Sequence, residues 1–551
     1  MSEKLRILFN TEASFLNSGF ANYTRELISR LQASGKYDIA ELSSYGFVND
    51  PRDVLITWKY YANAVRNNDP RYEIYNSHSE NQFGKWRFDK VVLDFKPHVV
   101  IDVRDYWMSY YVKFSPLRRR FHWILMPTVD SAPQQESWID TFLSADAIFT
   151  YSDWGAETLK TQTANKINYI DTTSPGVNLE IFKPLQNRQQ ARDFLGIPKD
   201  YLIVGSVMRN QKRKLIPELI LSFKKYLDTI KNSTLKSKTY LYLHTSYPDM
   251  GWDIPELLKN SGLSNRVLFT YKCQACNKIS SRVFAGTNIV CPNCMSREMG
   301  LSSVSNGIAE QELCAVYNTF DLYVQYAICE GFGMPQVEAA ACGVPVCSVD
   351  YSAMKDVIKK LYAFSIPVST YFKEMETKAI RVYPDNDSLV NYMIQFFETP
   401  ESMRNKKRKK IRSLTEKHYN WEHIANKWEN YLDTLNISDL DKLQHAHQIK
   451  PEKNVTIANN KMANISNIIE MVQNSKYLSE IVDMGYVLDI LKNADYGFEQ
   501  AGSRISQYNM DNAAKAMNAL IDYNNTVYSI EKNQNYQQED FIQYAKIKSS
   551  L

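Results

Sequence analysis

The sequence contains few cysteines, no long apolar run and little net charge. Eight cysteines among 551 residues are too few for a disulfide-rich scaffold. No stretch approaches the ~18 consecutive apolar residues that a membrane-spanning helix needs. The 65 lysines and arginines exceed the 61 aspartates and glutamates by four, so bulk charge does not indicate a nucleic acid or a membrane as partner. Such a partner has to be argued from local features.

The composition that remains is that of a large globular protein. Hydrophobic residues make up 44% and charged residues 23%, and the length corresponds to about three or four domains. The opening MSEKLRILFN has acidic Glu3 and only a short apolar run, which is typical of a first β-strand and not of a secretion signal. We therefore expect a soluble, cytoplasmic protein without a transmembrane segment.

Short apolar runs alternate with amphipathic stretches, which predicts βαβ units and parallel sheets. Residues 1–185 form one such series and 186–435 form a second, so the sequence predicts two Rossmann-like α/β domains facing a cleft. Residues 271–300 interrupt the second series with a cysteine-bearing insert. After residue 435 apolar residues recur at helical spacing, and no proline follows residue 451. We expect 440–551 to be a helical C-terminal extension.

The most informative string spans residues 330–346, EGFGMPQVEAAACGVPV. It follows an expected strand at 322–324. Pro335 suits the first turn of a helix and Gly343 suits the position after its end. Glycines at 331 and 333 allow a close approach of the backbone to a ligand just before that helix, where free N–H groups favour anions and hydroxyl oxygens. The string predicts a loop that holds a polar ligand between two carboxylates, Glu330 and Glu338.

This string resembles the E-x7-E signature of glycosyltransferase family 4, whose members have the GT-B fold, use a nucleotide-diphosphate sugar and retain anomeric configuration. Segments 17–27, 174–184 and 205–214 are similar to further motifs of the family in the same order. The resemblance covers about residues 4 to 435 without the insert. It implies an acceptor-side N-terminal domain and a nucleotide-sugar-binding second domain.

The resemblance also implies roles for single residues. Arg209 and Lys214 would neutralise the donor diphosphate, as any leaving group that gains negative charge requires. Glu338 would hold the ribose hydroxyls, and Glu330 would orient the sugar and stabilise its developing positive charge. The further residues implied in donor binding are Gly19 and, through the backbone beside Glu330, Gly331, Phe332, Gly333 and Met334.

Two positions leave alternatives open. Many family members carry a T-x-H histidine that contacts the donor sugar, whereas this sequence has Asp130 at the corresponding place. Asp130 either replaces that histidine as a catalytic residue or caps a helix that follows it. His244, at the end of an expected strand, either lines the nucleotide pocket or has a structural role.

Cys273-Gln-Ala-Cys276 and Cys291-Pro-Asn-Cys294 form two C-x2-C pairs separated by 14 residues. Four thiolates at such spacing predict one closed, tetrahedral zinc site that folds the insert and does not catalyse. No Asp-x-Asp pair is found at a cleft-facing position, so no catalytic metal is predicted.

The sequence thus predicts a retaining glycosyltransferase that transfers a hexose or pentose from a nucleotide-diphosphate sugar to a hydroxyl. The acceptor stays open among glycans, small molecules, lipids and modified nucleic acids, and so does the oligomeric state. One alternative is a nucleotide-sugar epimerase or phosphorylase on the same fold. Another is a non-enzymatic nucleic-acid-binding protein that uses the zinc ribbon and the basic runs at 118–120 and 404–410.

Overall fold

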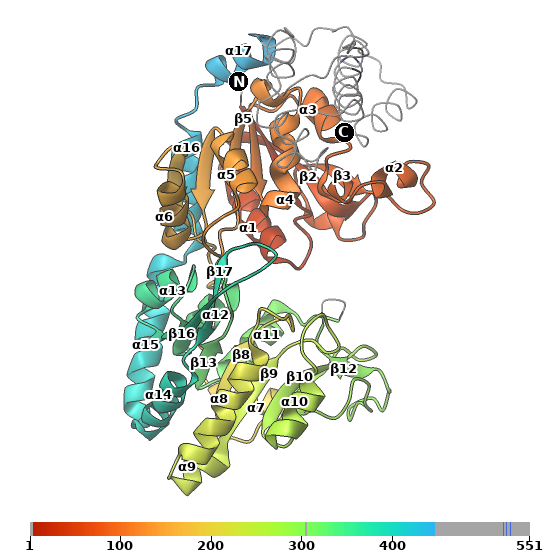
Figure 1. Ribbon diagram of the computed structural model, residues 1–551. Coiled ribbons are helices and arrows are strands. Elements are labelled where there is room, and N and C mark those ends of the chain that lie inside the picture. The colour runs from red at the N-terminus through yellow and green to blue at the C-terminus, as the bar shows by residue number, and fades with distance from the viewer. Residues whose placement is uncertain (1–3, 304–305, 447–521, 523–524, 526–528, 530–551) are drawn as a thin grey trace, which may run out of the picture. The chain divides into compact units, whose positions relative to one another are not determined.

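The computed structural model in Figure 1 describes residues 4–303, 306–446, 522, 525 and 529. Of these residues, those within 1–127, 140–148 and 431–551 form one compact unit, and those within 128–139 and 149–430 form another. The predicted boundaries near residues 185 and 435 stay predictions. The predicted C-terminal extension lies outside the described residues except for 440–446 and the three isolated positions. None of the described helices is long and apolar enough to cross a membrane.

The first sheet has seven strands in the order β3-β2-β1-β4-β5-β6-β7, and the pairs from β3 to β6 are parallel. Its middle strands are apolar runs buried on both faces, as in sheets that helices cover on both sides. The strands are β1 (Leu5–Glu12), β2 (Tyr37–Phe47), β3 (Lys59–Ala64), β4 (Val99–Val103), β5 (His122–Met126), β6 (Ala147–Thr150) and β7 (Tyr169–Thr172).

Helices alternate with these strands, as the sequence pattern predicts. They are α1 (Gly19–Ala33), α2 (Tyr72–Asn76), α3 (Phe88–Phe95), α4 (Tyr106–Ser109), α5 (Glu136–Leu143) and α6 (Asp153–Gln162). The start of α1 is set by Ser18, whose side chain accepts a hydrogen bond from the backbone of Ala21. Short 3-10 turns lie at 53–55, 79–83, 110–114 and 118–120.

The second sheet repeats this topology in the order β11-β10-β9-β8-β13-β14-β15, with β12 paired to β10. Its strands are β8 (Leu202–Val207), β9 (Thr239–His244), β10 (Val267–Cys273), β11 (Ile279–Val283), β12 (Met299–Leu301), β13 (Leu322–Gln325), β14 (Val346–Val349) and β15 (Phe364–Ile366). Strands β11 and β12 pair antiparallel with β10 and carry the cysteine insert. The predicted α/β class with two Rossmann-like sheets and an inserted cysteine unit is confirmed.

Helices cover both faces of the second sheet. They are α7 (Arg188–Leu195), α8 (Ile216–Thr229), α9 (Ser233–Lys238), α10 (Ile254–Ser261), α11 (Glu310–Thr319), α12 (Met334–Ala341), α13 (Met354–Leu361), α14 (Asn386–Glu398) and α15 (Glu401–His418). Helix α16 (Trp421–Leu432) follows them, and α17 (Ile437–Ala446) belongs to the first unit, where Asp441 pairs with Arg6. Val204 and Leu241 belong to one apolar core with residues of α8, α10 and α14. On the other face a Cβ at Gly205 would lie 2.2 Å from the Phe320 ring, so a larger residue there would displace the helix layer. Figure 1 shows α8 and α10 beside strands β8 to β10.

A separate two-stranded hairpin follows the second sheet. Its antiparallel strands are β16 (Val368–Lys373) and β17 (Ile380–Pro384). The backbone N–H of Ile380 donates to the carbonyl of Ala132 at 2.8 Å, and that of Val382 donates to the carbonyl of Ile328 at 3.3 Å. The hairpin is therefore joined to two segments that are far from it in sequence.

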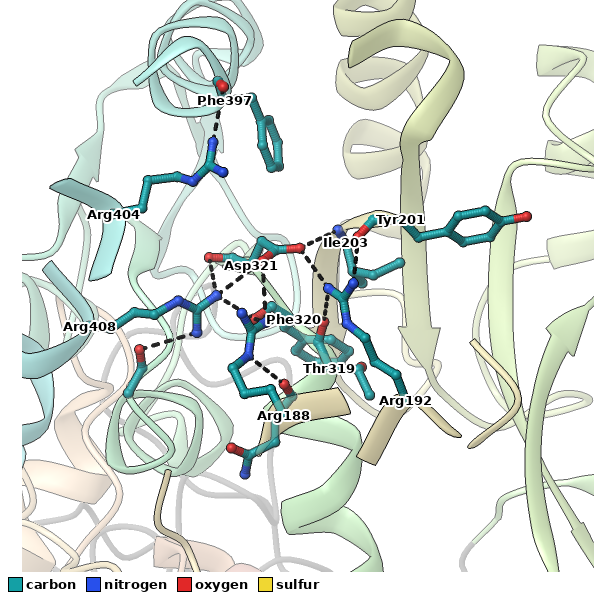
Figure 2. A network of polar contacts seen from close by, with 12 residues as sticks. Arg188, Arg192, Tyr201, Ile203, Thr319, Phe320, Asp321, Phe397, Arg404 and Arg408 are labelled. Carbon is teal, nitrogen blue, oxygen red and sulfur yellow. Dashed lines mark hydrogen bonds and ion pairs between the residues drawn. The ribbon is translucent and has the colours of Figure 1, made fainter. Parts of the chain in front are cut away.

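A buried ion cluster at the amino end of β13 joins several elements of the second sheet (Figure 2). The Asp321 carboxylate accepts from Arg188 and Arg408 at 3.2 Å, from Arg192 at 3.0 Å and from the backbone N–H of Ile203 at 2.9 Å. Burial raises the pKa of Asp321, but the three guanidinium charges outweigh it and hold that pKa below its usual value. The arginines also donate to carbonyls at the end of α11, whose helix dipole favours positive charge.

We predict that Asp321→Asn lowers the free energy of unfolding by about 3 kcal/mol at pH 7, because it leaves buried arginines without their carboxylate. Urea unfolding followed by circular dichroism measures this loss. The contribution is present above the unfolded pKa of about 3.9 and is lost as pH falls through the lower folded pKa, so the variant and the wild type converge in acid. Asp228→Asn, which removes an exposed pair with Lys224, is the matched control and should change stability by less than about 1 kcal/mol. An equally small loss for Asp321→Asn would contradict the prediction.

Candidate active site

The order of the second sheet reverses between β8 and β13, which are parallel neighbours. In doubly wound sheets ligands bind at the carboxyl ends of the strands where the order reverses. The loop after β8 contains residues 208–215 and the loop after β13 contains residues 326–333. The sequence places the predicted phosphate-binding cations in the first loop and Glu330 in the second, so the topology brings them together.

Glu330 is the centre of this juxtaposition. Its carboxylate is 6% exposed, forms an ion pair with the Lys214 ammonium, and accepts from Arg213 and from the Gln325 amide at 2.9 Å. Burial raises the pKa of Glu330, but the charges of Lys214 and Arg213 outweigh it and lower the pKa to about 2. The backbone N–H of Glu330 donates to Ser352 Oγ at 3.0 Å. Glu330 is therefore a fixed, ionised group.

The two arginines of the β8 loop have different partners. Arg209 pairs with Asp249 through two nitrogens at 3.0 and 3.1 Å. Arg213, which the sequence analysis did not single out, is the arginine at Glu330, and that charge raises the pKa of Arg213. The exposed fractions of the two side chains are 46% for Arg209 and 41% for Arg213. No sequence signal separated these two arginines, since they stand four residues apart in one basic loop.

Glu338 lies on the second turn of α12. Pro335 stands in the first turn, and Gly333 precedes the helix with φ of +89°, a backbone conformation that favours glycine. Glu338 accepts a hydrogen bond from the Tyr317 hydroxyl at 2.7 Å. Burial raises the pKa of Glu338 to about 7, and the Tyr317 hydrogen bond opposes that rise only in part. The pKa values of the two glutamates of the motif are therefore shifted in opposite directions.

The loop between the glutamates is closely packed. A Cβ at Gly331 would lie 2.4 Å from Thr128 Cγ2, so this position excludes any larger side chain. Phe332 is buried and contacts the Tyr419 ring with centroids 5.6 Å apart, while Met334 begins α12. The packing explains why glycines stand at 331 and 333.

Asp130 lies against the same loop. Its carboxylate pairs with Arg381 at 3.1 Å and accepts from the Cys329 thiol at 3.2 Å and from the Ser131 hydroxyl at 2.8 Å. The alternative role as a helix cap is wrong, because α5 begins only at Glu136. Arg381 carried no sequence signal, and only the fold places it beside Asp130.

His244 ends β9, as predicted, and its Nδ1 lies 2.9 Å from Thr270 Oγ1 on the neighbouring strand. Burial lowers the pKa of His244 to about 4, so it is neutral near pH 7. This bond supplies the partner that a structural histidine would need, and the role of His244 in the pocket stays a prediction.

Gly19 begins α1 in the first unit, next to the Ser18 cap, and a Cβ there would meet open space. At the carboxyl end of β4, Asp102 and Arg104 form a fully buried ion pair. Asn10 donates to Asp102 at 3.0 Å and Trp123 donates to it at 2.8 Å.

The four cysteines of the insert converge. The Sγ atoms of Cys273, Cys276, Cys291 and Cys294 all lie within 4.8 Å of one another, and two pairs are 3.6 and 3.8 Å apart. Zinc–sulfur bonds of about 2.3 Å in a tetrahedron give sulfur–sulfur distances of about 3.8 Å. The cluster therefore fits a zinc ion, and all four cysteines are free of disulfides.

Comparison with known structures shows the same fold. Sucrose-phosphate synthase from Thermosynechococcus elongatus aligns over 78% of this chain and 99% of its own, with a TM-score of 0.56 and 18% identity. Anabaena HepE in complex with UDP-glucose aligns over 78% and 100%, with a TM-score of 0.55 and 12% identity. A glycosyltransferase from Rickettsia africae aligns over 79% and 100%, with a TM-score of 0.52 and 15% identity. A search of curated proteins found no match.

A family model gives the remaining comparison. Residues 294–413 match the family described as "Glycosyl transferases group 1". The matched segment includes β13, α12 and both glutamates of the E-x7-E motif. Residues 294–413 thus match the group 1 glycosyltransferase family, and the chain shares the two-sheet GT-B fold of the solved glycosyltransferases.

Proposed function

We propose that this protein is a retaining glycosyltransferase that transfers a hexose or pentose from a nucleotide-diphosphate sugar to an acceptor hydroxyl. The observation that carries the proposal is the ionised Glu330, held by Lys214 and Arg213 between the loops after β8 and β13. Glu338 stands one helical turn into α12, the helix that follows the Glu330 loop. The matched family segment contains both glutamates.

Donor binding would use the cations of the β8 loop. Arg209, Arg213 and Lys214 each already have a carboxylate partner, which fixes their positions before a ligand arrives. Arg209 uses two nitrogens for Asp249 and Arg213 uses one for Glu330, while both side chains are more than two-fifths exposed. A guanidinium has five N–H donors, so donors remain for diphosphate oxygens. Fixed cations stabilise the leaving diphosphate most as its charge grows.

Glu338 would accept hydrogen bonds from the ribose hydroxyls of the donor. Two hydroxyls need two acceptor oxygens, which only the ionised carboxylate offers in full. Glu330 would orient the sugar together with the backbone N–H groups of 331–334 and stabilise its positive charge. Family resemblance supports a front-face transfer in which the departing phosphate oxygen takes the acceptor proton. No catalytic metal is needed for this step, since Arg209, Arg213 and Lys214 supply positive charge.

We further propose that Asp130 accepts hydrogen bonds from the donor sugar, that His244 lines the nucleotide pocket and that Gly19 takes part in donor binding. Asp130 is 30% exposed, which leaves part of its carboxylate open to a ligand.

The insert would hold one structural zinc ion through Cys273, Cys276, Cys291 and Cys294. A four-thiolate site has no open position, so the metal would stabilise the β10–β12 region without entering the reaction.

Nucleotide-sugar affinity should rise by about tenfold from pH 6 to pH 8, because Glu338 with a pKa of about 7 is mostly protonated at the lower pH. Calorimetric titration with UDP-glucose, GDP-mannose and ADP-glucose measures this affinity. The charge of these diphosphate diesters does not change between pH 6 and pH 8. Glu338→Gln should bind weakly at both pH values. Tyr317→Phe should shift the profile to higher pH, because it removes a hydrogen bond that lowers the pKa of Glu338. A flat wild-type profile, or no binding of any of the three, would refute the proposal.

Turnover should depend on the charge of Glu330. Glu330→Gln is expected to reduce release of the nucleoside diphosphate from the preferred donor, with water as acceptor, by about 10²-fold or more. Its affinity for the donor should change far less, because the cations and Glu338 remain. Chromatography of the released nucleotide measures turnover, and titration measures affinity. Equal losses of both would assign Glu330 to binding alone.

Elemental analysis of protein purified without added metal should give one zinc per chain. Cys291→Ser should lose that zinc and lower the melting temperature by a few degrees. Cys314→Ser, a buried cysteine outside the cluster, is the matched control and should keep the metal. Zinc-free wild-type protein that melts like Cys291→Ser would overturn the zinc site.

A further inference from the structure

Arg381 is a buried cation of the hairpin whose nitrogen donors all have partners. Its side chain is 7% exposed. One terminal nitrogen contacts Asp130 Oδ1 at 3.1 Å and Cys329 Sγ at 2.8 Å, and the other two nitrogens contact Glu374 Oε2 at 3.0 and 2.7 Å. The guanidinium thus spans three segments that are separate in sequence.

The backbone on either side of Arg381 fixes this position. Ile380 bonds to Ala132, two residues after Asp130, and Val382 bonds to Ile328, two residues before Glu330. The Tyr351 hydroxyl also donates to the Ile380 carbonyl at 2.5 Å. Strand β17 therefore lies between the Asp130 segment and the Glu330 segment, and Arg381 is the residue that faces both.

The surrounding charges form a series of ion pairs at the hairpin, with a further ion pair at Glu330. Glu374 pairs with Arg381 and Arg381 with Asp130, while Arg213 pairs with Glu330. Glu330 raises the pKa of Arg213 most, and Asp130 contributes to the same rise. The Cys329 thiol lies within the series, and burial raises its pKa, so it stays neutral and donates to Asp130.

The group formed by Glu374, Arg381 and Asp130 carries a net charge of −1, and Asp130 is its most exposed member at 30%. A carboxylate fixed in this way by Arg381 and the Cys329 thiol keeps acceptor capacity on its open side. Hydroxyl groups of a neutral sugar match that capacity, since they can donate to it without bringing further charge.

We propose that Arg381 is a positioning residue for Asp130, and that the pair sets the affinity for the sugar portion of the donor without affecting the nucleotide portion. The inference rests on the proposed function, because it requires a nucleotide sugar in the site. Arg381 acts through Asp130, and Glu374 holds the far side of the guanidinium.

The test compares each nucleotide sugar with its nucleoside diphosphate: UDP-glucose with UDP, GDP-mannose with GDP and ADP-glucose with ADP. Arg381→Met should weaken binding of the preferred nucleotide sugar by about tenfold and that of its nucleoside diphosphate by less than about twofold. Asp130→Asn should do the same. The double variant should lose no more than either single variant, because coupled residues are not additive. Arg381→Lys keeps the positive charge but lacks the planar guanidinium with its several donors, so its nucleotide-sugar affinity should lie between those of wild type and Arg381→Met.

Matched controls lie on the same hairpin. Lys373→Met removes an exposed positive charge and should leave both affinities unchanged. Glu374→Gln should weaken sugar-nucleotide binding, whereas Glu376→Gln, on the exposed loop, should not. Retained nucleoside diphosphate affinity shows that each variant is folded.

Equal weakening of the nucleotide sugar and the nucleoside diphosphate in Arg381→Met would overturn the inference and leave the proposed function intact. A double variant whose loss of nucleotide-sugar affinity equals the sum of the two single losses in free energy would overturn the inference as well. A wild-type protein that binds none of the six compounds would overturn both the proposed function and this inference.

Discussion

The structure of the second sheet depends on one buried carboxylate, Asp321, shared by three arginines. Two of them come from α7 and the third, Arg408, from α15, so a single side chain ties both helices to the amino end of β13 (Figure 2). Arg412, one turn along α15, donates to the carbonyl of Ala341 at the end of α12. The helix that carries Glu338 is thereby anchored from the edge of the sheet opposite the ligand loops.

Two glutamates of one motif acquire opposite properties from their neighbours. Burial raises the pKa of both, but Glu330 has Lys214 and Arg213 beside it, whereas Glu338 accepts from the neutral Tyr317 hydroxyl and the charge of Glu310 raises its pKa further. One is therefore ionised throughout the physiological range and the other changes charge near neutrality. A fixed charge suits transition-state stabilisation, and a titrating acceptor suits reversible binding of hydroxyls.

Sequence reasoning reached the fold class and the cysteine cluster, because each rests on a local pattern, whereas only the family resemblance implied that Lys214 and Glu330 act on one donor. Alternating apolar runs define strands, C-x2-C pairs define a ligand set, and prolines and glycines mark the start and end of α12. It did not find Arg213 or Arg381. Arg213 looks like Arg209 in a loop with several cations, and the Arg381 contact with Asp130 spans 251 positions along the chain.

The sequence by itself determined which residues stand at the carboxyl ends of strands, since hydrophobic periodicity and turn residues act over a few positions. The tertiary structure alone decided which charges meet: Arg213 and not Arg209 at Glu330, Tyr317 at Glu338, and Arg381 at Asp130. Electrostatic interactions fall off with distance in space and depend on burial, and neither quantity is a function of separation along the chain.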